Sequence, residues 1–143
     1  MNLREISADA KASGDFSRLS GIAPYARFVG LSLKQIDGRL VTVLAGSPII
    51  IGNPMLPAIH GGAVGTLLES AALFQLIMTG KATRLPKTIS ITIDYLRSAR
   101  PVDTFAEGLI TKQGRRIANV RVEAWQDDRS RPVATAHAHF LLS

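Results

Sequence analysis

One acidic residue stands inside an otherwise uncharged helical stretch, and no residue of the chain is better suited to chemistry. From residue 63 to residue 78 the chain reads AVGTLLESAALFQLIM, and Glu69 is the only ionisable residue in it. Apolar residues occur on every side of the helical wheel, which predicts a largely buried helix. A buried carboxylate is costly unless it is hydrogen-bonded, paired or kept for chemistry. Composition leaves three interpretations open: a reacting carboxylate, a satisfied structural glutamate, and a glutamate at the solvated end of an oligomer interface.

The residues before this stretch favour the reacting carboxylate. His60-Gly61-Gly62 stands where the helix begins, and glycines there let another group approach the backbone. The first turn of a helix has unpaired N–H groups and a partial positive charge, which suit an anion or a developing oxyanion. A glycine-rich turn that only leads into the helix is the competing interpretation.

The spacing of these two features constrains how they could act together. Gly61 and Glu69 are eight positions apart, which is about 12 Å along a helix axis. A catalytic base must be within hydrogen-bond reach of the reacting group, or one water away. If both residues are catalytic, Glu69 of one subunit therefore faces Gly61 of another. The sequence predicts an obligate oligomer with a site shared between subunits.

Length and composition limit the class of protein. The chain has 143 residues and 46% apolar content, which predicts a single domain over residues 1–143 with a substantial core. It has no cysteine, so neither disulfides nor thiolate metal sites are available. A net charge of +6 favours polyanionic partners, but no nucleic-acid-binding motif accompanies the charge, and a phosphorylated small ligand fits at least as well.

The chain contains nothing typical of secretion. Residues 1–15 are polar and carry acidic residues, unlike a signal peptide, and we expect them to be frayed or to form a short helix. No stretch is expected to be long enough to span a bilayer. A cytoplasmic location without membrane contact is the default prediction.

The elements that position these residues follow from turn signals and hydrophobic periodicity. An apolar turn or helix is expected at 23–28, and a strand region at 30–47 with a turn at Asp37-Gly38. Pro54 and Pro57 mark a loop before the long helix, which ends near Gly80. Beyond Pro86 the period changes to two, and strands are expected at 88–95, 103–113, 115–126 and 131–142. Short turns favour an antiparallel sheet of five to six strands wrapped around one long buried helix, an α+β arrangement.

From about Pro24 to Leu142 the chain resembles the hotdog-fold acyl-CoA thioesterases of the phenylacetate-pathway (PaaI-like) branch. The strongest segment is HGGAVGTLLESA at 60–71, which is similar to that family's His-Gly-Gly followed by a helix acid. The supporting segments are PYARFVGL at 24–31, ITIDYLRSARPVD at 91–103, GRRIANVRVEAW at 114–125 and VATAHAHFLL at 133–142. Their order and spacing together make the resemblance fairly specific.

The resemblance implies a mechanism. Glu69 is the expected general base or nucleophile in hydrolysis of a thioester, and the backbone N–H of Gly61 from the neighbouring subunit is expected to polarise the carbonyl. The sequence does not separate activation of water from formation of a transient anhydride. The expected oligomer is a homotetramer built from two hotdog dimers. The substrate is expected to be a small aromatic or medium-chain acyl-CoA, and no separate cofactor is expected.

Three further positions correspond to family features. The family has an Asn or Gln before the His, and Asn53 either fills that role through a one-residue shift or is a turn residue before Pro54. His60 is expected to order the loop and the start of the helix. Thr88 matches a position where related enzymes carry a hydroxyl near the attacking water, although a polar residue on the outside of a strand explains it equally well.

Charged side chains provide candidate contacts to the substrate. We expect Gly62 to line the site and the guanidinium groups of Arg97, Arg115 and Arg116 to be candidates for the phosphates of coenzyme A, with solvated surface charge as the competing interpretation. Arg115 and Arg116 point to opposite faces if 115–126 is a strand. His137 and His139 share a strand face without a third ligand, so no metal site is predicted.

Parts of the sequence are also compatible with two other functions. Dehydratases also use the hotdog fold, but they need a His just upstream of the proline loop, where this chain has Ile49-Ile50-Ile51. Dehydration is therefore not favoured. A non-catalytic acyl-CoA-binding or sensing module remains open, because a Glu replaces the Asp that is commonest in this branch. An acid beside a thioester favours an enzyme over a binder.

Overall fold

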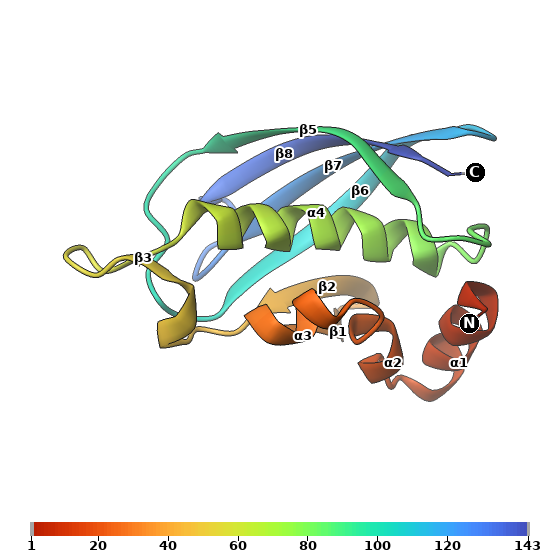
Figure 1. The fold of residues 1–143 in the computed structure, drawn as a ribbon, viewed down its shortest axis with the longest axis horizontal. Helices are drawn as coiled ribbons and strands as arrows, with labels where there is room; N and C mark the ends of the chain where they lie inside the picture. The colour runs from red at the N-terminus through yellow and green to blue at the C-terminus, as the bar shows by residue number, and fades with distance from the viewer. Residues whose placement is uncertain (1, 143) are drawn as a thin grey trace.

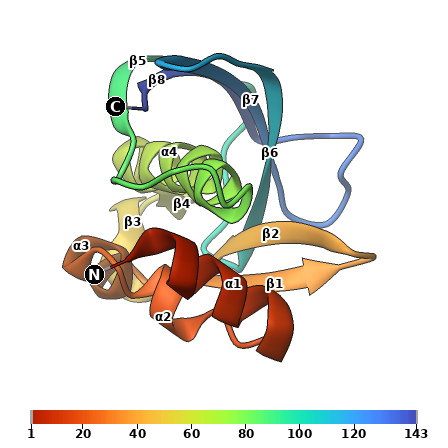
Figure 2. The same ribbon diagram turned by 90° about the vertical axis from the view of Figure 1, so that its right-hand side faces the viewer.

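A curved antiparallel sheet wraps around one long helix in this protein (Figures 1 and 2). The computed structural model describes residues 2–142. The helical elements are α1 (Leu3–Ser13), α2 (Ser17–Ser20), α3 (Pro24–Val29), the 3-10 turn η1 (Pro48–Ile50) and α4 (Gly61–Met78). The strands are β1 (Leu31–Ile36), β2 (Arg39–Leu44), β3 (Ile51–Asn53), β4 (Ala58–Ile59), β5 (Lys87–Tyr95), β6 (Thr104–Gln113), β7 (Ile117–Trp125) and β8 (Ala134–Leu141).

The main sheet has the strand order β1-β2-β6-β7-β8-β5, and every neighbouring pair is antiparallel. Strands β6, β7 and β8 form a meander, as the short turns predicted. Strand β5 precedes them in sequence but lies at the edge of the sheet, paired only with β8 within this chain. The predicted hotdog arrangement, with five to six strands around one helix, is confirmed with six strands.

Local sequence explains the first hairpin. β1 and β2 are joined by Asp37-Gly38, and both residues have positive φ angles, 52° and 75°. A two-residue hairpin of the type I′ kind needs this conformation at both positions, and Asp-Gly is one of the dipeptides that supply it. The predicted turn at this position is therefore confirmed.

Alternation along the strands brings small and apolar side chains to α4. In β7 the buried residues are Ala118, Val120, Val122 and Ala124. Gly108 of β6 lies so close to the helix that a Cβ there would be 3.1 Å from the carbonyl oxygen of Ala71. Close contact between β6 and α4 thus depends on the absence of a side chain at residue 108.

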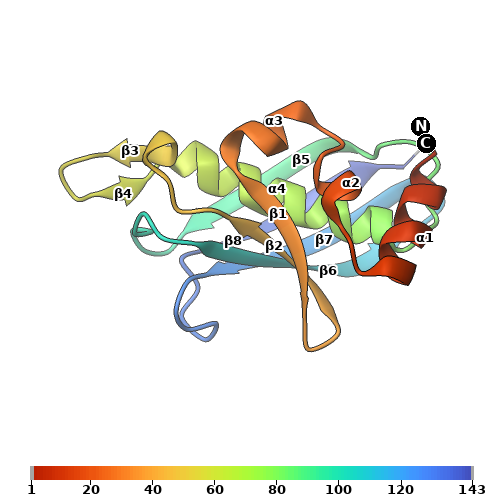
Figure 3. The same ribbon diagram turned by 90° about the horizontal axis from the view of Figure 1, so that it is seen from below.

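The N-terminal segment forms a helix rather than a frayed end. Asn2 caps α1, since its side chain accepts a hydrogen bond from the N–H of Arg4 at 3.0 Å. Buried Leu3 and Ile6 of α1 belong to the same apolar cluster as Phe74 and Ile77 of α4. α1 therefore covers the C-terminal half of α4, whereas α3 lies near its N-terminal half (Figures 1 and 3).

Two expectations about the long helix are corrected. α4 is long and apolar enough to cross a membrane by length and composition, so the prediction that no stretch reaches that length is wrong. Half of this helix is buried within the protein, where it packs against β6, β7 and β2, and its length is only weak support for a membrane span. Burial is also less uniform than predicted, because one stripe of α4 (Gly62, Thr66, Glu69 and Leu73) remains partly exposed.

The proline-marked loop has structure of its own. β3 and β4 form a small two-stranded hairpin with Pro54 and Pro57 in its turn, and this hairpin projects beyond the end of the sheet (Figure 3). Met55 and Leu56 at its tip are largely exposed. The hairpin leads directly into the start of α4.

Candidate active site

The start of α4 is held by His60. This residue is the N-cap, and its Nδ1 accepts a hydrogen bond from the N–H of Gly62 at 2.8 Å. The N–H of His60 in turn donates to the carbonyl oxygen of Ile50 at 2.7 Å. A Cβ at Gly62 would be 2.9 Å from that Nδ1, so a side chain there would displace the cap. The geometry is that of a residue ordering the loop and helix start.

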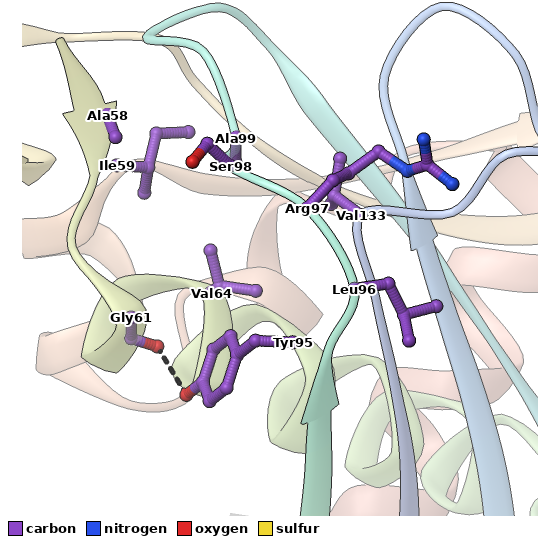
Figure 4. A pocket seen from close by; sticks show the side chains of 10 residues that line it. All are labelled: Ala58, Ile59, Gly61, Val64, Tyr95, Leu96, Arg97, Ser98, Ala99 and Val133. Carbon is purple, nitrogen blue, oxygen red and sulfur yellow. Dashed lines mark hydrogen bonds between the residues drawn. The ribbon is translucent and has the colours of Figure 1, made fainter. Parts of the chain in front are cut away.

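Gly61 is the first helical residue, and Tyr95 at the end of β5 is packed against it. The Tyr95 hydroxyl donates a hydrogen bond to the Gly61 carbonyl oxygen at 2.8 Å (Figure 4). The Gly61 N–H belongs to the first helical turn, where an N–H has no intrahelical acceptor. Among residues 2–142 no side chain accepts from it either. It is therefore a donor available to a ligand.

Glu69 lies on the partly exposed stripe of α4. Gly62, Thr66, Glu69 and Leu73 follow one another at helical spacing, and none of them is buried by the chain. The Glu69 side chain is half-buried, and no salt bridge or side-chain hydrogen bond to it occurs among the described residues. A carboxylate in this state is neither a satisfied core residue nor a freely solvated one.

α4 is continuous from Gly61 through Glu69, so the separation predicted from the sequence holds in the structure. Eight residues of α-helix place the two about 12 Å apart along the axis. Gly61 and Glu69 of one chain therefore do not act on the same carbonyl.

A cleft of about 350 Å³ opens beside Gly61 (Figure 4). Residues 95–99, which include the end of β5, contribute half of its lining, and the rest comes from β4, α4 and Val133. The complete lining is Ala58, Ile59, Gly61, Val64, Tyr95, Leu96, Arg97, Ser98, Ala99 and Val133. The cleft gives a small molecule access to the helix start.

Arg97 borders this cleft, and its side chain points away from Gly61 (Figure 4). Its Nε donates to the carbonyl oxygen of Pro132 at 3.1 Å. A second cleft of about 320 Å³ shares Arg97, Ser98 and Val133 with the first, and its other lining residues are Arg100, Gln126, Asp127, Asp128 and Arg131. The two clefts together run from Gly61 to the arginines at positions 97, 100 and 131.

Carboxylates in the loop after β7 shape the second cleft. Arg100 forms an ion pair with Asp127. Asp128 accepts hydrogen bonds from the hydroxyl and the N–H of Ser130, at 2.7 and 2.9 Å, and these bonds lower the pKa of Asp128. The loop is thus ordered by its own side chains.

Arg115 and Arg116 lie far from this region within one chain. The strand expected at 115–126 begins at Ile117, so both arginines belong to the turn after β6 and the alternation of strand faces does not apply to them. Arg115 lines a cleft of about 540 Å³ with Arg4 and Lys81, beyond the C-terminal end of α4. The 18 residues of α4 span about 27 Å. These arginines are not brought together with Gly61.

Asn53 is engaged in a local turn. Its Oδ1 accepts a hydrogen bond from the N–H of Met55 at 2.9 Å, and the residue is exposed in the projecting hairpin. This is the turn interpretation of a residue before proline. Within one chain the amide oxygen is therefore engaged in the turn.

Thr88 lies in the exposed first part of β5, where the register with β8 shifts between residues 88 and 90. His137 and His139 of β8 are exposed and alternate with buried alanines, so they face outward from the sheet. Among the residues that the structure describes, no three His, Asp or Glu side chains form a group that could hold a metal ion.

Sequence reasoning missed Tyr95 as part of the site. In the sequence it is one member of an alternating strand, and its partner Gly61 is 34 positions away. Its place at the end of a period-two run, just before Leu96-Arg97-Ser98, was the only local signal. The contact itself depends on where β5 ends relative to α4.

Comparison with known proteins gives an independent result. The family model described as the thioesterase superfamily matches residues 56–133. The chain is also similar to the medium/long-chain acyl-CoA thioesterase YigI of Salmonella typhimurium, with 25% identity over 135 residues, covering 83% of this chain and 85% of that protein.

Solved structures show the same fold. A protein of Chromobacterium violaceum is 38% identical with a TM-score of 0.77, and the match covers 97% of each chain. A phenylacetic acid degradation-related protein of Ralstonia eutropha is 25% identical with a TM-score of 0.73, and the match covers 88% of this chain and 98% of that one.

Proposed function

The chain belongs to the thioesterase superfamily, and we propose that it hydrolyses the thioester bond of an acyl-CoA with Glu69 as the catalytic carboxylate. The observation that carries this proposal is that α4 presents both a free backbone donor and a carboxylate. Its capped start offers the Gly61 N–H to a ligand, and a half-buried Glu69 lies two turns further along. The similarity to acyl-CoA thioesterases supports acyl-CoA as the substrate class.

The proposed reaction needs only the substrate, water and these groups. The Gly61 N–H donates to the thioester carbonyl oxygen and stabilises the charge that develops there; one such donor is typically worth about 3 kcal/mol of transition-state stabilisation. Glu69 takes a proton from water as the water oxygen attacks the carbonyl carbon. The C–S bond then breaks, the thiolate of coenzyme A leaves and takes up a proton, and the carboxylic acid is released. Direct attack by Glu69 through an anhydride gives the same products.

We propose that the two groups come from different subunits. The separation of about 12 Å along α4 supports this, as do two features of the isolated chain. The stripe that contains Glu69 is partly exposed, and among residues 2–142 the nine-residue strand β5 has no partner on one side. An exposed edge strand is a template for pairing with another copy. The proposed assembly is a dimer with two shared sites, and two such dimers form a tetramer.

We propose that the coenzyme A arm follows the cleft beside Tyr95 and Leu96 toward the guanidinium of Arg97. The continuation into a cleft lined by Arg97, Arg100 and Arg131 supports this direction, because guanidinium groups bind phosphate in fork geometry. Asp127 and Asp128 line the same cleft, and Asp127 pairs with Arg100, so Arg97 and Arg131 are the guanidinium groups proposed for the phosphates. Gly62 lines the helix start. Arg115 and Arg116 take part only if another subunit brings them to the site.

The first test is a thiol-release assay of the wild type and Glu69→Gln against aromatic and aliphatic acyl-CoAs. The Gln variant keeps the shape of the side chain and removes its charge, so it should fold normally and lose nearly all turnover. Wild-type-like turnover by this variant contradicts the mechanism. Tight binding without turnover in both proteins indicates an acyl-CoA sensor instead.

A second test isolates the Gly61 N–H. Gly61 is the first helical residue and His60 has ψ 133°, so proline is compatible with both positions and removes only the donor. Gly61→Ala keeps the donor, and its Cβ would meet the Tyr95 ring at an ordinary 3.5 Å. We expect Gly61→Pro to lower kcat by about 10²–10³-fold and Gly61→Ala to retain most activity. Equal losses in both variants would exclude the donor role.

Mixing two inactive variants tests whether the site is shared. A hybrid of Glu69→Gln and Gly61→Pro subunits contains one site with both groups intact and one with neither. Random reassociation should restore about a quarter of wild-type activity, since half of the dimers are hybrids and each has one intact site of two. If both groups act within one subunit, the mixture stays inactive.

A further inference from the structure

A further cleft borders the start of α4, and residues of α3 contribute to its lining. α3 and β5 lie on opposite sides of α4 (Figures 1 and 2). The volume of this further cleft is about 220 Å³, and its lining residues are Tyr25, Phe28, Val29, Ile49, Ile50, His60, Gly62 and Ala63. Gly62 and His60 belong to the turn that presents the Gly61 N–H. The cleft therefore adjoins the proposed reaction centre without being part of the cleft beside Tyr95.

The chemistry of this lining is apolar. Its ionisable residues are His60 and the phenol of Tyr25, and the Nδ1 of His60 already accepts a hydrogen bond from the N–H of Gly62. The rings of Tyr25 and Phe28 are stacked with their centroids 6.3 Å apart. Both remain exposed, at 58% and 65%, as does Ile49 at 58%. A group of large exposed apolar side chains rimming a hollow marks a binding surface.

A thioester has two arms, and the helix start has two clefts. The coenzyme A arm carries amides and ends in phosphates, which match Arg97, Ser98 and the polar continuation that contains Arg131. The acyl arm has no polar group beyond the carbonyl. Of the two clefts, the one beside Tyr25 and Phe28 contains no cationic Arg or Lys and matches that arm.

We infer that Tyr25, Phe28 and Ile49 form the acyl-group subsite and determine substrate specificity. This inference rests on the proposed function. The preferred acyl group is an apolar one of several carbons or with an aryl ring, because acetyl would leave the aromatic pair uncovered. Phe28 contributes most, being the more exposed ring on a short helix directly beside the start of α4.

The test compares kcat/KM for acetyl-CoA, octanoyl-CoA and phenylacetyl-CoA in the wild type, Phe28→Ala and Phe28→Leu. Phe28→Ala should lose about tenfold or more with the two larger substrates and change by less than about twofold with acetyl-CoA, since pocket contacts discriminate by the apolar area they cover. Phe28→Leu should recover most of the octanoyl activity. Leu109→Ala is the matched control, because Leu109 is equally exposed at 64% but lies in β6.

The outcomes separate this inference from the proposed function. A wild type that hydrolyses none of the substrates contradicts the function itself. An active wild type whose chain-length profile is unchanged in Phe28→Ala overturns the inference alone. Loss with all three substrates together with a change in native mass also overturns it, since the residue then serves a subunit contact. Ile49→Trp gives a second reading, because filling the cleft should reduce octanoyl-CoA hydrolysis and spare acetyl-CoA.

Discussion

The hydroxyl of Tyr95 donates a hydrogen bond to the carbonyl oxygen of Gly61 at 2.8 Å. The bond joins the end of the edge strand β5 to the first residue of α4, so the peptide unit after Gly61 is fixed relative to the sheet. The same tyrosine forms a wall of the cleft that reaches the Gly61 N–H. One side chain thus positions the helix start and borders the substrate path.

Tyr95→Phe is expected to lower both stability and activity moderately. A hydrogen bond of this kind contributes about 0.5–1.5 kcal/mol to the free energy of unfolding, and a looser helix start should reduce kcat/KM several-fold. Denaturant unfolding and the thiol-release assay measure the two effects. Tyr25→Phe is the stability control, because no described residue forms a hydrogen bond with the Tyr25 hydroxyl. Unchanged activity in Tyr95→Phe would show that the bond does not position the donor.

His60→Ala and His60→Asn separate capping from chemistry. Loss of an N-cap side chain costs about 1 kcal/mol of unfolding free energy, and we expect this for the Ala variant. Asn retains an acceptor for the Gly62 N–H and should restore both stability and kcat. If the Asn variant is stable but as inactive as the Ala variant, His60 has a role in the reaction beyond capping.

Gly108→Val tests the contact between β6 and α4. A Cβ at this position would lie 3.1 Å from the Ala71 carbonyl oxygen and 3.3 Å from the Ala72 Cα, and both atoms belong to the helix backbone. The helix would have to move away from the sheet, at a cost of about 1–3 kcal/mol in the free energy of unfolding. Gly114→Ala is the control, since its Cβ would lie 3.4 Å from the nearest atom. Equal stability of the two variants would contradict this packing argument.

Ser130→Ala should reveal a pH-dependent contribution from the loop beside Arg97. The Ser130 hydroxyl and N–H lower the pKa of Asp128 in the folded state. The resulting stabilisation is present above the unfolded-state pKa of Asp128 and is lost as pH falls through the lower folded-state pKa. The wild type should therefore be more stable than Ser130→Ala at neutral pH, and the difference should vanish in strong acid. Urea unfolding across the acidic range measures it. A difference that grows on acidification contradicts the assignment.

Local sequence was sufficient for most elements of the fold. The change from helical spacing to period two predicted α4 and β5, and the Asp37-Gly38 turn predicted the first hairpin, because these patterns report which face of an element is buried. Short turns predicted an antiparallel sheet, and the tertiary structure supplied the order of its strands. The hairpin formed by β3 and β4 was missed, since two strands of three and two residues give no periodicity to detect.

The sequence by itself determined the separation of Gly61 from Glu69, because helix geometry is set by the backbone and needs no neighbour. Tertiary structure decided everything that depends on where elements meet. It joined Tyr95 to Gly61 across 34 positions and left Glu69 half-buried on a partly exposed stripe of α4. It also placed Arg97 near the start of α4 and Arg115 beyond its other end. A one-dimensional pattern records the burial of an element but not which surface covers it, and the packing of the sheet around α4 supplies that information.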